Sequence, residues 1–535
     1  MNKSVKLSIG IFSFFIFHFS FLSAQESNSL YQNQSFRHFD RYVYKSSERF
    51  HTSVKPFLNS QVYNIVTTDS LNLKLVNSKA GDIIFNRSLI QFEKDDFSFT
   101  IDPLFNFEIG KDLDSSNMSY INTRGVLVNA KLGKYVSVST SFYENQARFN
   151  DYRHARIQKL GRKVMPGQGY GKAFGDSLPQ TYDYGFAEGY VSFTPSEHFN
   201  FTFGHGKNFI GDGYRSLLLS DNSFNYPYFR ITTDFWNIKY VNIWSQYQDL
   251  TVKHPYGIPF DKKWSSMHYL DWSVTDWLNI GFFEAIIWQH ADSTGVRGFD
   301  FNYANPVIFL RPVEFSVSSP DNAIMGINGK LTLFNNHILY GQAVIDEFKF
   351  SELKARNGWW ANKWGIQAGY KTYDLFEIEH LDIQTEFNYV RPFMYSHNST
   401  LRNYAHYNQP LAHPLGSNFW ESVSFVRYNK DRIFFEGRIS YAKHGRDTAN
   451  LNFGNDLYKD YDTHEKEYDN YLGQAEEVNL IYATAQVAYL VNKRTNLNVY
   501  LKYTLRKESS SSINTNQGLI TFGIRTSLQN FYYDF

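Results

Sequence analysis

Apolar and polar residues alternate along much of this chain, most regularly between residues 323 and 347. Met325, Ile327 and Leu331 occupy every second position, and Asn328 and Lys330 stand between them. A period of two is that of a β-strand, whose successive side chains point to opposite faces. A strand of about ten residues with one apolar and one polar face suits the wall of a transmembrane barrel.

The same alternation recurs from residue 97 to near the end of the chain. It predicts an all-β fold, a transmembrane antiparallel barrel of about 18 strands, an even number as in bacterial barrels. The predicted strands are 97–109, 119–132, 135–145, 184–194, 199–206, 228–234, 237–247, 266–273, 277–289, 323–333, 337–347, 364–371, 376–390, 418–427, 432–441, 480–490, 497–506 and 517–527.

The connections between these strands alternate in length. Short ones, such as 133–134 and 274–276, are followed by long ones, such as 146–183 and 391–417. Short periplasmic turns and long extracellular loops are typical of outer-membrane barrels. A soluble β-sandwich would also have alternating strands, but it has no reason to sort its connections by length. The final Phe531, Tyr533 and Phe535 repeat with period two and resemble the terminal sorting signal of outer-membrane proteins.

Composition agrees with a barrel. Of the 535 residues, 42% are hydrophobic and 18% are aromatic, and the mean hydropathy of −0.43 predicts no helical membrane spans. The net charge of +1 gives no indication of a nucleic-acid partner. Since the chain contains no cysteine, disulfides, thiolate chemistry and lipid attachment at a mature N-terminal cysteine are excluded.

The sequence predicts three parts. Residues 1–24 have a basic start, an apolar core and a small-residue cleavage site at Ser23-Ala24, as in a secretory signal peptide. A retained anchor helix is the alternative. Residues 25–96 alternate poorly and are assigned to the periplasm or to a plug, and residues 97–535 to the barrel. We therefore expect an exported protein of the bacterial outer membrane, in contact with its lipid.

Two charged stretches are candidate ligand sites. The glycine-rich stretch 204–221 carries Lys207, Asp212, Tyr214 and Arg215, and it lacks the Lys-Ser/Thr ending of a phosphate-binding loop. These side chains either present a ligand site near the pore mouth or hold a loop inside the lumen through structural ion pairs. Arg311 and Glu314 form a second charged pair, in a proline-containing loop before the central hairpin.

Aromatic and amide side chains gather in two long loops. Flat rings can pack against the apolar faces of sugars while amides and charged groups pair with their hydroxyls, so we predict polysaccharide as the ligand. For the tryptophans, the alternative is the aromatic girdle of a barrel. The candidates are Trp359, Trp360, Arg391, Tyr395, Tyr404, Tyr407, Gln409 and His413.

The sequence carries no catalytic motif that we recognise, so we predict a protein that is not an enzyme and has no cofactor. Ser396 and His397 are adjacent, and neighbours on an extended chain point to opposite faces. His397, His406 and His413 lack the spacing of a compact metal site, and the acidic loop 456–469 lacks that of a calcium loop.

Several segments resemble the capsule-assembly Wzi-like outer-membrane proteins, closest to the branch in gliding Bacteroidota called gliding motility protein RemB. The resemblance implies an 18-stranded barrel, a helical periplasmic element and a surface lectin that attaches or organises exported polysaccharide. The resemblance runs from about residue 30 to the C-terminus, and the motif positions it carries are 207, 212, 215, 311, 314, 346 and the loop 404–413. The segments are GHGKNFIGDGYRSLLLSD, NPVIFLRPVEF, DNAIMGINGK, LYGQAVIDEF and NYAHYNQPLAHPLGSNF.

The leading hypothesis is therefore a barrel that binds or organises surface polysaccharide, in support of gliding. Polar inward residues such as Lys330, Gln342 and Asp346 leave a transport pore as one alternative. A scaffold that docks gliding or secretion machinery proteins is the other.

Overall fold

The structure, a computed structural model, describes residues 40–45, 49–65, 78–115, 117–174, 180–255, 257–293, 295–307, 309–317, 319–334, 336–448 and 450–535. The predicted signal peptide, residues 1–24, lies outside these ranges. So do residues 25–39, 46–48 and 66–77 of the segment assigned to the periplasm or a plug.

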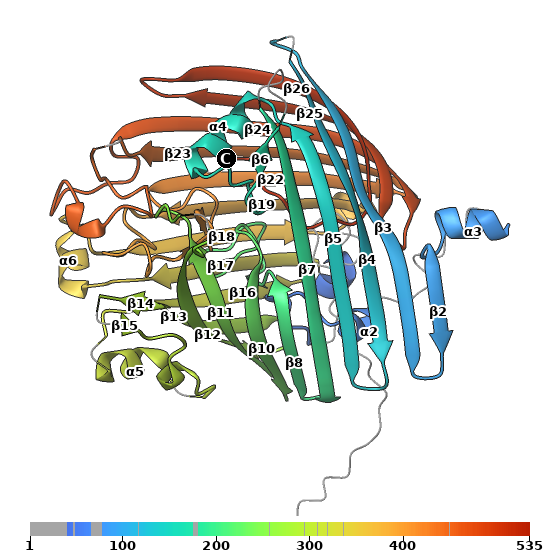
Figure 1. Cartoon of the computed structure of the whole chain (residues 1–535), viewed down its shortest axis with the longest axis horizontal. Coiled ribbons are helices and arrows are strands. Elements are labelled where there is room, and N and C mark those ends of the chain that lie inside the picture. The colour runs from blue at the N-terminus through green and yellow to red at the C-terminus, as the bar shows by residue number, and fades with distance from the viewer. Residues whose placement is uncertain are drawn as a thin grey trace, which may run out of the picture.

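Eighteen antiparallel strands form a closed barrel (Figure 1), which confirms the predicted fold and strand count. Each strand pairs with its neighbours in chain order, and β26 closes the ring by pairing with β3. The wall consists of β3 (Phe97–Asp112), β4 (Met118–Leu132), β5 (Val136–Arg148), β7 (Thr181–Ser196), β8 (Phe199–Gly206), β10 (Tyr226–Phe235), β11 (Ile238–Asp249), β12 (Asp261–Ser273), β13 (Leu278–Gln289), β16 (Asn322–Leu333), β17 (His337–Ile345), β18 (Trp364–Thr372), β19 (Leu381–Val390), β22 (Phe419–Lys430), β23 (Ile433–Arg446), β24 (Glu476–Asn492), β25 (Leu497–Ser509) and β26 (Asn514–Arg525).

Two strand starts differ most from the prediction. β12 begins at Asp261, earlier than expected, and β19 begins at Leu381, later than expected. The second difference has a local cause, because Phe376 and Glu377 have φ angles of 55° and 63°. Such left-handed backbone cannot continue a strand, so this stretch forms a turn.

The wall has an apolar outer face and a polar inner face, as the alternation predicts. In the central hairpin Ile327 and Leu339 are exposed on the outside, whereas Asn328 and Gln342 are buried on the inside. Exposed aromatic residues such as Trp236 stand at the short turns, where barrels carry a girdle.

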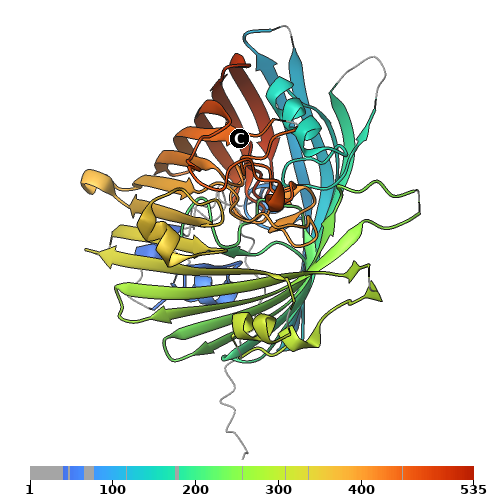
Figure 2. The ribbon, with the colours of Figure 1, turned by 90° about the vertical axis from the view of Figure 1, so that its left-hand side faces the viewer.

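Short turns gather at one end of the barrel, the short-turn end, and most long connections at the other, the long-loop end (Figure 2). No helix among the described residues is long and apolar enough to cross a membrane. The smaller elements are β1 (Val54–Lys55), β2 (Ile90–Lys94), β6 (Lys172–Ala173), β9 (Phe209–Ile210), β14 (Ala291–Asp292), β15 (Gly295–Val296), β20 (Ala405–His406), β21 (Gln409–Pro410), α2 (Asn59–Ile65), α3 (Lys79–Phe85), α4 (Asp151–Leu160), α5 (Leu310–Ser316), α6 (Phe350–Ala355), η2 (Phe301–Tyr303), η3 (Leu375–Glu377) and η4 (Tyr461–Thr463).

The N-terminal residues 40–45 and 49–65 pack against the inner face of the wall. β1 pairs with β9, and Ser53 Oγ donates to the inward carboxylate of Asp271 at 3.0 Å. Lys45 forms an ion pair with Asp374 in the turn before β19. This stretch therefore fills part of the lumen at the short-turn end.

The last ten residues also enter the lumen. β26 ends at Arg525, and residues 526–535 follow it as an extended segment without wall pairing, the C-terminal tail. The Asp534 carboxylate accepts a bond from the inward Arg438 at 3.0 Å, and the Phe535 carbonyl accepts one from Arg506. The alternating Phe531, Tyr533 and Phe535 are thus luminal and do not form the last strand.

Candidate functional site

A loop between β8 and β10, residues 207–225, crosses the lumen, and we call it the septum. The Leu217 amide donates to Gln342 of β17 at 2.8 Å. The Tyr214 amide donates to Glu386 of β19, also at 2.8 Å. The septum therefore reaches strands far around the ring from the two that it connects.

Arg215 anchors the septum to the opposite wall. Its Nη2 and Nε donate to the two carboxylate oxygens of Glu421 at 2.8 and 3.1 Å. Its Nη2 also lies 3.1 Å from Asp534 of the C-terminal tail. Glu421 belongs to β22, which lies opposite β8 in the ring of strands. Paired charges of this kind are tolerated inside a protein because each satisfies the other.

Asp212 joins the septum to the N-terminal segment and to the wall. Its carboxylate accepts bonds from Tyr44 at 2.9 Å, from Thr52, and from Asn328 of β16 at 3.3 Å. Burial alone would raise the pKa of Asp212, but the positive charges of Lys330 and Lys55 and the bond from Thr52 hold it below its usual value. Asp212 is therefore a buried carboxylate with hydrogen-bond partners in the N-terminal segment and on β16.

The long loop 391–418, the cover loop, lies on the septum. Tyr395 and Tyr404 donate to the carbonyls of Leu217 and Leu218 at 2.7 and 2.6 Å. The Ser220 amide donates to the Leu411 carbonyl at 2.8 Å. Septum, cover loop and C-terminal tail together pack the lumen with protein.

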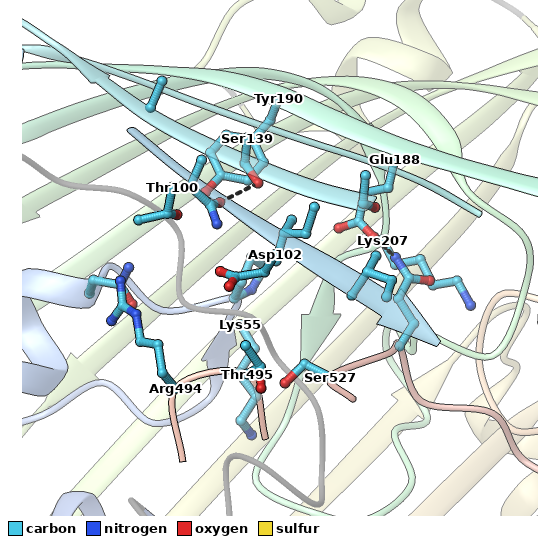
Figure 3. Close-up of a pocket in the computed structure, with 18 of the residues that line it drawn as sticks. Lys55, Thr100, Asp102, Ser139, Glu188, Tyr190, Lys207, Arg494, Thr495 and Ser527 are labelled. Carbon is cyan, nitrogen blue, oxygen red and sulfur yellow. Dashed lines mark hydrogen bonds between the residues drawn. The ribbon is translucent and has the colours of Figure 1, made fainter. Parts of the chain in front are cut away.

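A cavity of about 550 Å³ remains in the half of the lumen nearest the short turns (Figure 3). It lies between the inner faces of β3, β4, β5 and β7, the septum and the tail. Hydroxyls such as those of Thr100 and Ser139 line it together with the carboxylates of Asp102 and Glu188. We call it the luminal cavity.

Two lysines border the luminal cavity from the septum and from β1. Lys207 Nζ donates to the Gly167 and Asp221 carbonyls at 2.8 and 3.0 Å, and Lys55 Nζ donates to the Gly211 carbonyl at 2.6 Å. Burial lowers the pKa of each to about 8. Both amines are tied to backbone carbonyls, so they hold the septum in place.

A second, smaller hollow of about 300 Å³ lies at the long-loop end, and we call it the rim pocket. Its walls come from α6 and the residues after it, from the end of β19, and from residues 470–472. The lining residues are Glu352, Leu353, Arg356, Gly358, Trp359, Asn362, Tyr389, Arg391, Asn470, Tyr471 and Leu472.

One backbone and two side-chain hydrogen bonds join the segments that line the rim pocket. The Asn470 amide donates to the Gly358 carbonyl at 2.9 Å, and Arg391 Nη2 donates to the Trp359 carbonyl at 3.2 Å. The Trp359 indole donates to Glu467 at 2.6 Å. The ring of Tyr471 is 62% exposed. The pocket thus combines aromatic surfaces, an arginine and amides, groups that can contact a sugar.

The structure does not bring the predicted ligand residues into one site. Trp359 and Arg391 line the rim pocket, and Lys207 lines the luminal cavity. Trp360 is buried, with its ring stacked on that of His464 at 4.3 Å. The remaining candidates in the septum and the cover loop are buried among their partners: Asp212, Tyr214, Arg215, Tyr395, Tyr404, Tyr407, Gln409 and His413.

Arg311 and Glu314 lie on the outer face of the wall. They belong to α5 and form an ion pair of 2.6 Å one helical turn apart. α5 packs through Leu310 on Ile286 and Trp288 of β13, and the alternate residues Ala285 and Ile287 face the septum inside. The predicted loop is therefore a short helix outside the barrel (Figure 1).

Arg356, Asn470 and Tyr471 also line the rim pocket, and no periodic pattern in the sequence pointed to them. Asn470 and Tyr471 follow the acidic stretch 456–469, and their link to Trp359 spans more than a hundred residues. The aromatic Tyr471 in a second long loop was the one sequence signal for this side of the pocket. The period of two in the strands does not show which of the long loops lie next to each other.

No family model matches the sequence, and no curated protein matches it. Solved structures do match. One is Wzi of Escherichia coli, described as an outer membrane protein involved in group 1 capsule assembly and a carbohydrate-binding β-barrel. The alignment covers 95% of this chain and 100% of that one, with a TM-score of 0.55 and 12% identity. The chain has the fold of Wzi. At this identity the likeness shows the fold alone.

The barrel also resembles OprD of Pseudomonas aeruginosa, with a TM-score of 0.42 and 11% identity over 80% of this chain and 94% of that one. OpdK from the same organism, solved with vanillate, has a TM-score of 0.42 and 7% identity over 80% of this chain and 98% of that one. These likenesses are too distant to bear on function.

Proposed function

We propose that this chain is an outer-membrane protein that binds surface polysaccharide in the rim pocket, without chemical turnover. The observation that carries the proposal is the rim pocket itself, where Trp359, Tyr471, Arg391 and Asn470 meet at the long-loop end. In an outer-membrane barrel that end faces the cell exterior, so the pocket meets sugars at the surface.

Two further facts support the proposal. The Wzi barrel, whose fold this chain shares, is described as carbohydrate-binding and as involved in capsule assembly. In addition, the septum and the cover loop pack the lumen, which suits a binding protein better than an open channel. A role in gliding rests on the sequence resemblance to the gliding branch, and loss of gliding in a deletion strain is its test.

A transport pore is the second candidate, and the luminal cavity favours it. A cavity lined by hydroxyls and by both signs of charge could hold a polar solute. The septum separates this cavity from the cover loop, so conduction requires the septum to move.

The test of the proposal is binding of the full, detergent-purified chain to polysaccharide extracted from the surface of its host. We expect saturable binding that weakens at least about tenfold, roughly 1.4 kcal/mol, in a Trp359→Ala, Tyr471→Ala variant. An Arg311→Ala, Glu314→Ala variant is the control and keeps its affinity, since that pair lies on the outer face. If the wild type and the rim variant bind equally, or if only the control variant loses binding, the polysaccharide site does not lie in the rim pocket.

A further inference from the structure

The connection between β13 and β16 lies on the outside of the barrel wall. We call residues 297–307 and 309–317 the strap. It includes η2 and α5, and it packs on Ile286, Trp288 and Ala323. These three residues belong to the outer face, because in β13 their neighbours Ala285 and Ile287 belong to the luminal core. The strap therefore covers a surface that a barrel normally presents to lipid.

The strap satisfies polar groups on this outer face. The Trp244 indole and the Asn242 amide donate to the Tyr303 and Pro306 carbonyls, each at 2.9 Å. Glu284 accepts from the Leu310 amide at 3.0 Å and pairs with His268 at 3.1 Å. An unsatisfied polar group in hydrocarbon costs several kcal/mol. Their pairing with the strap is what a lipid environment requires.

The strap also turns large apolar side chains outward. Phe301, Val307, Phe309 and Phe315 are 84, 80, 76 and 83% exposed. They continue the exposed apolar residues of the wall, such as Phe203 and Phe229. In water, exposure of four such side chains on one short connection would be unfavourable. Hydrocarbon is the surrounding that suits both the strap and the wall.

Between the strap and the wall runs an apolar groove of about 590 Å³. Its floor is the outer face of four neighbouring strands, β8, β10, β11 and β12, and its side is the strap. Phe229 and Trp244 stack at 5.8 Å on the floor, and the Trp264 ring meets Phe299 of the strap edge-on at 5.6 Å. The lining residues are Phe203, Pro227, Tyr228, Phe229, Ile231, Trp244, Gln246, Trp264, Phe299, Ala304 and Pro306.

We propose that this groove is a binding site for one acyl chain of a membrane lipid. Its lining is hydrocarbon and aromatic apart from Gln246 and the inward-facing Tyr228, it opens on the lipid-facing side of the wall, and the strap continues that apolar surface. The groove lies toward the long-loop ends of β10, β11 and β12. The head group of the bound lipid consequently stands at the long-loop side.

Native mass spectrometry of the full chain, extracted from its membrane in a mild detergent, tests this. We expect a single lipid to stay bound at an activation that strips the others. Ala304→Trp fills the groove and loses that lipid. Ala343→Trp is the matched control, since Ala343 is exposed on the outer face of β17, a strand that does not line the groove, and it keeps the lipid. Heat-dependent gel migration checks that each variant is folded, and Ile231→Ser on the floor replaces Ala304→Trp if that variant does not fold.

Delipidated protein is then titrated with phosphatidylglycerol and phosphatidylethanolamine of identical chains. Equal retention of both supports recognition of the acyl chain. The proposal is overturned if the wild type keeps no lipid, if the groove variant keeps it as well as the control does, or if only one head group is retained. A dimer that the groove variant dissociates would assign the groove to a second copy and overturn the proposal too.

Discussion

Arg215 and Glu421, which are 206 residues apart in the sequence, meet inside the barrel in a two-bond ion pair. Both side chains are buried, and His413 Nε2 donates to the same carboxylate at 2.7 Å. Through this contact the septum, the cover loop and the far wall become one packed unit. The part of the lumen between the septum and the cover loop is therefore a protein core, and the luminal cavity lies on the other side of the septum.

Removal of one member of this pair should destabilise the barrel. Among the described residues, a Glu421→Ala variant leaves the Arg215 guanidinium with Asp534 as its one carboxylate partner. Breaking a buried pair costs about 3–5 kcal/mol. Guanidinium unfolding of the detergent-solubilised protein measures the change. Glu421→Gln keeps an acceptor oxygen and should lose less. An unchanged unfolding midpoint in both variants would show that the septum does not contribute to stability.

The C-terminal tail should keep the barrel closed to ions. A chain that ends at Arg525 lacks Asp534, which bonds Tyr214 at 3.0 Å and Arg438 at 3.0 Å. We expect low conductance of the wild type in planar bilayers and a clear increase after truncation. Asp534→Ala in the full chain tests the same contacts if the shortened chain does not assemble. Equal, high conductance of all three proteins would favour the transport pore.

Acid should loosen the cover loop through His406. Its Nε2 donates to the Asn225 carbonyl at 3.1 Å, and its Nδ1 accepts from the Gln248 amide at 2.9 Å. The bond to Nδ1 needs the neutral ring, because protonation of Nδ1 removes the acceptor. Burial lowers the pKa of His406 to about 3, while an unfolded histidine titrates near pH 6.5. A depressed histidine pKa means that stability is full above about pH 6.5 and falls as the pH drops toward 3.

Hydrogen exchange of residues 391–418 at pH 7 and pH 4.5 measures this effect. Exchange should be faster at the lower pH after correction for the intrinsic rate, and His406→Gln should reduce the difference. Identical protection at both pH values in the wild type would contradict the role given to His406.

A glycine shapes the rim pocket. Gly358 has a φ of +67°, and a Cβ there would stand 2.8 Å from the Asn470 nitrogen. We expect Gly358→Ala to weaken polysaccharide binding severalfold with little change in the unfolding midpoint of the barrel, because a strained backbone position costs about 1–3 kcal/mol and the site is peripheral. Gly133→Ala, at a short turn with open space around it and a φ of +70°, is the matched control. If Gly358→Ala and Gly133→Ala weaken polysaccharide binding equally, the loss of affinity does not arise from a change in the rim pocket.

The wall was predictable from sequence because lipid outside and polar contacts inside impose a period of two on every strand. Ile327 and Asn328, neighbours on opposite faces, illustrate this. The period of two at the C-terminus has a different structural origin. Residues 526–535 form an extended tail, so successive side chains point in opposite directions and contact different luminal partners. Phe531, Tyr533 and Phe535 therefore lie on one side of the tail, although the tail is not a strand of the wall.

The sites were harder to predict because loops carry no period. The sequence allowed Arg215 to be either a ligand residue or a structural ion-pair partner, and its partner Glu421 could not be identified without the fold. Arg311 and Glu314 were expected in a loop, since Pro312 stands between them, yet proline fits the first turn of α5. Trp359 and Arg391 were named from composition, and the structure adds Tyr471 beside them.

Oxidative footprinting of the full chain in lipid nanodiscs, with and without polysaccharide from the host's surface, tests the central proposal most directly. We expect protection of Trp359 and Tyr471, while the exposed Trp236 at a short turn reacts equally in both samples. Protection confined to the luminal cavity or to the strap, or no protection at any residue, would contradict it.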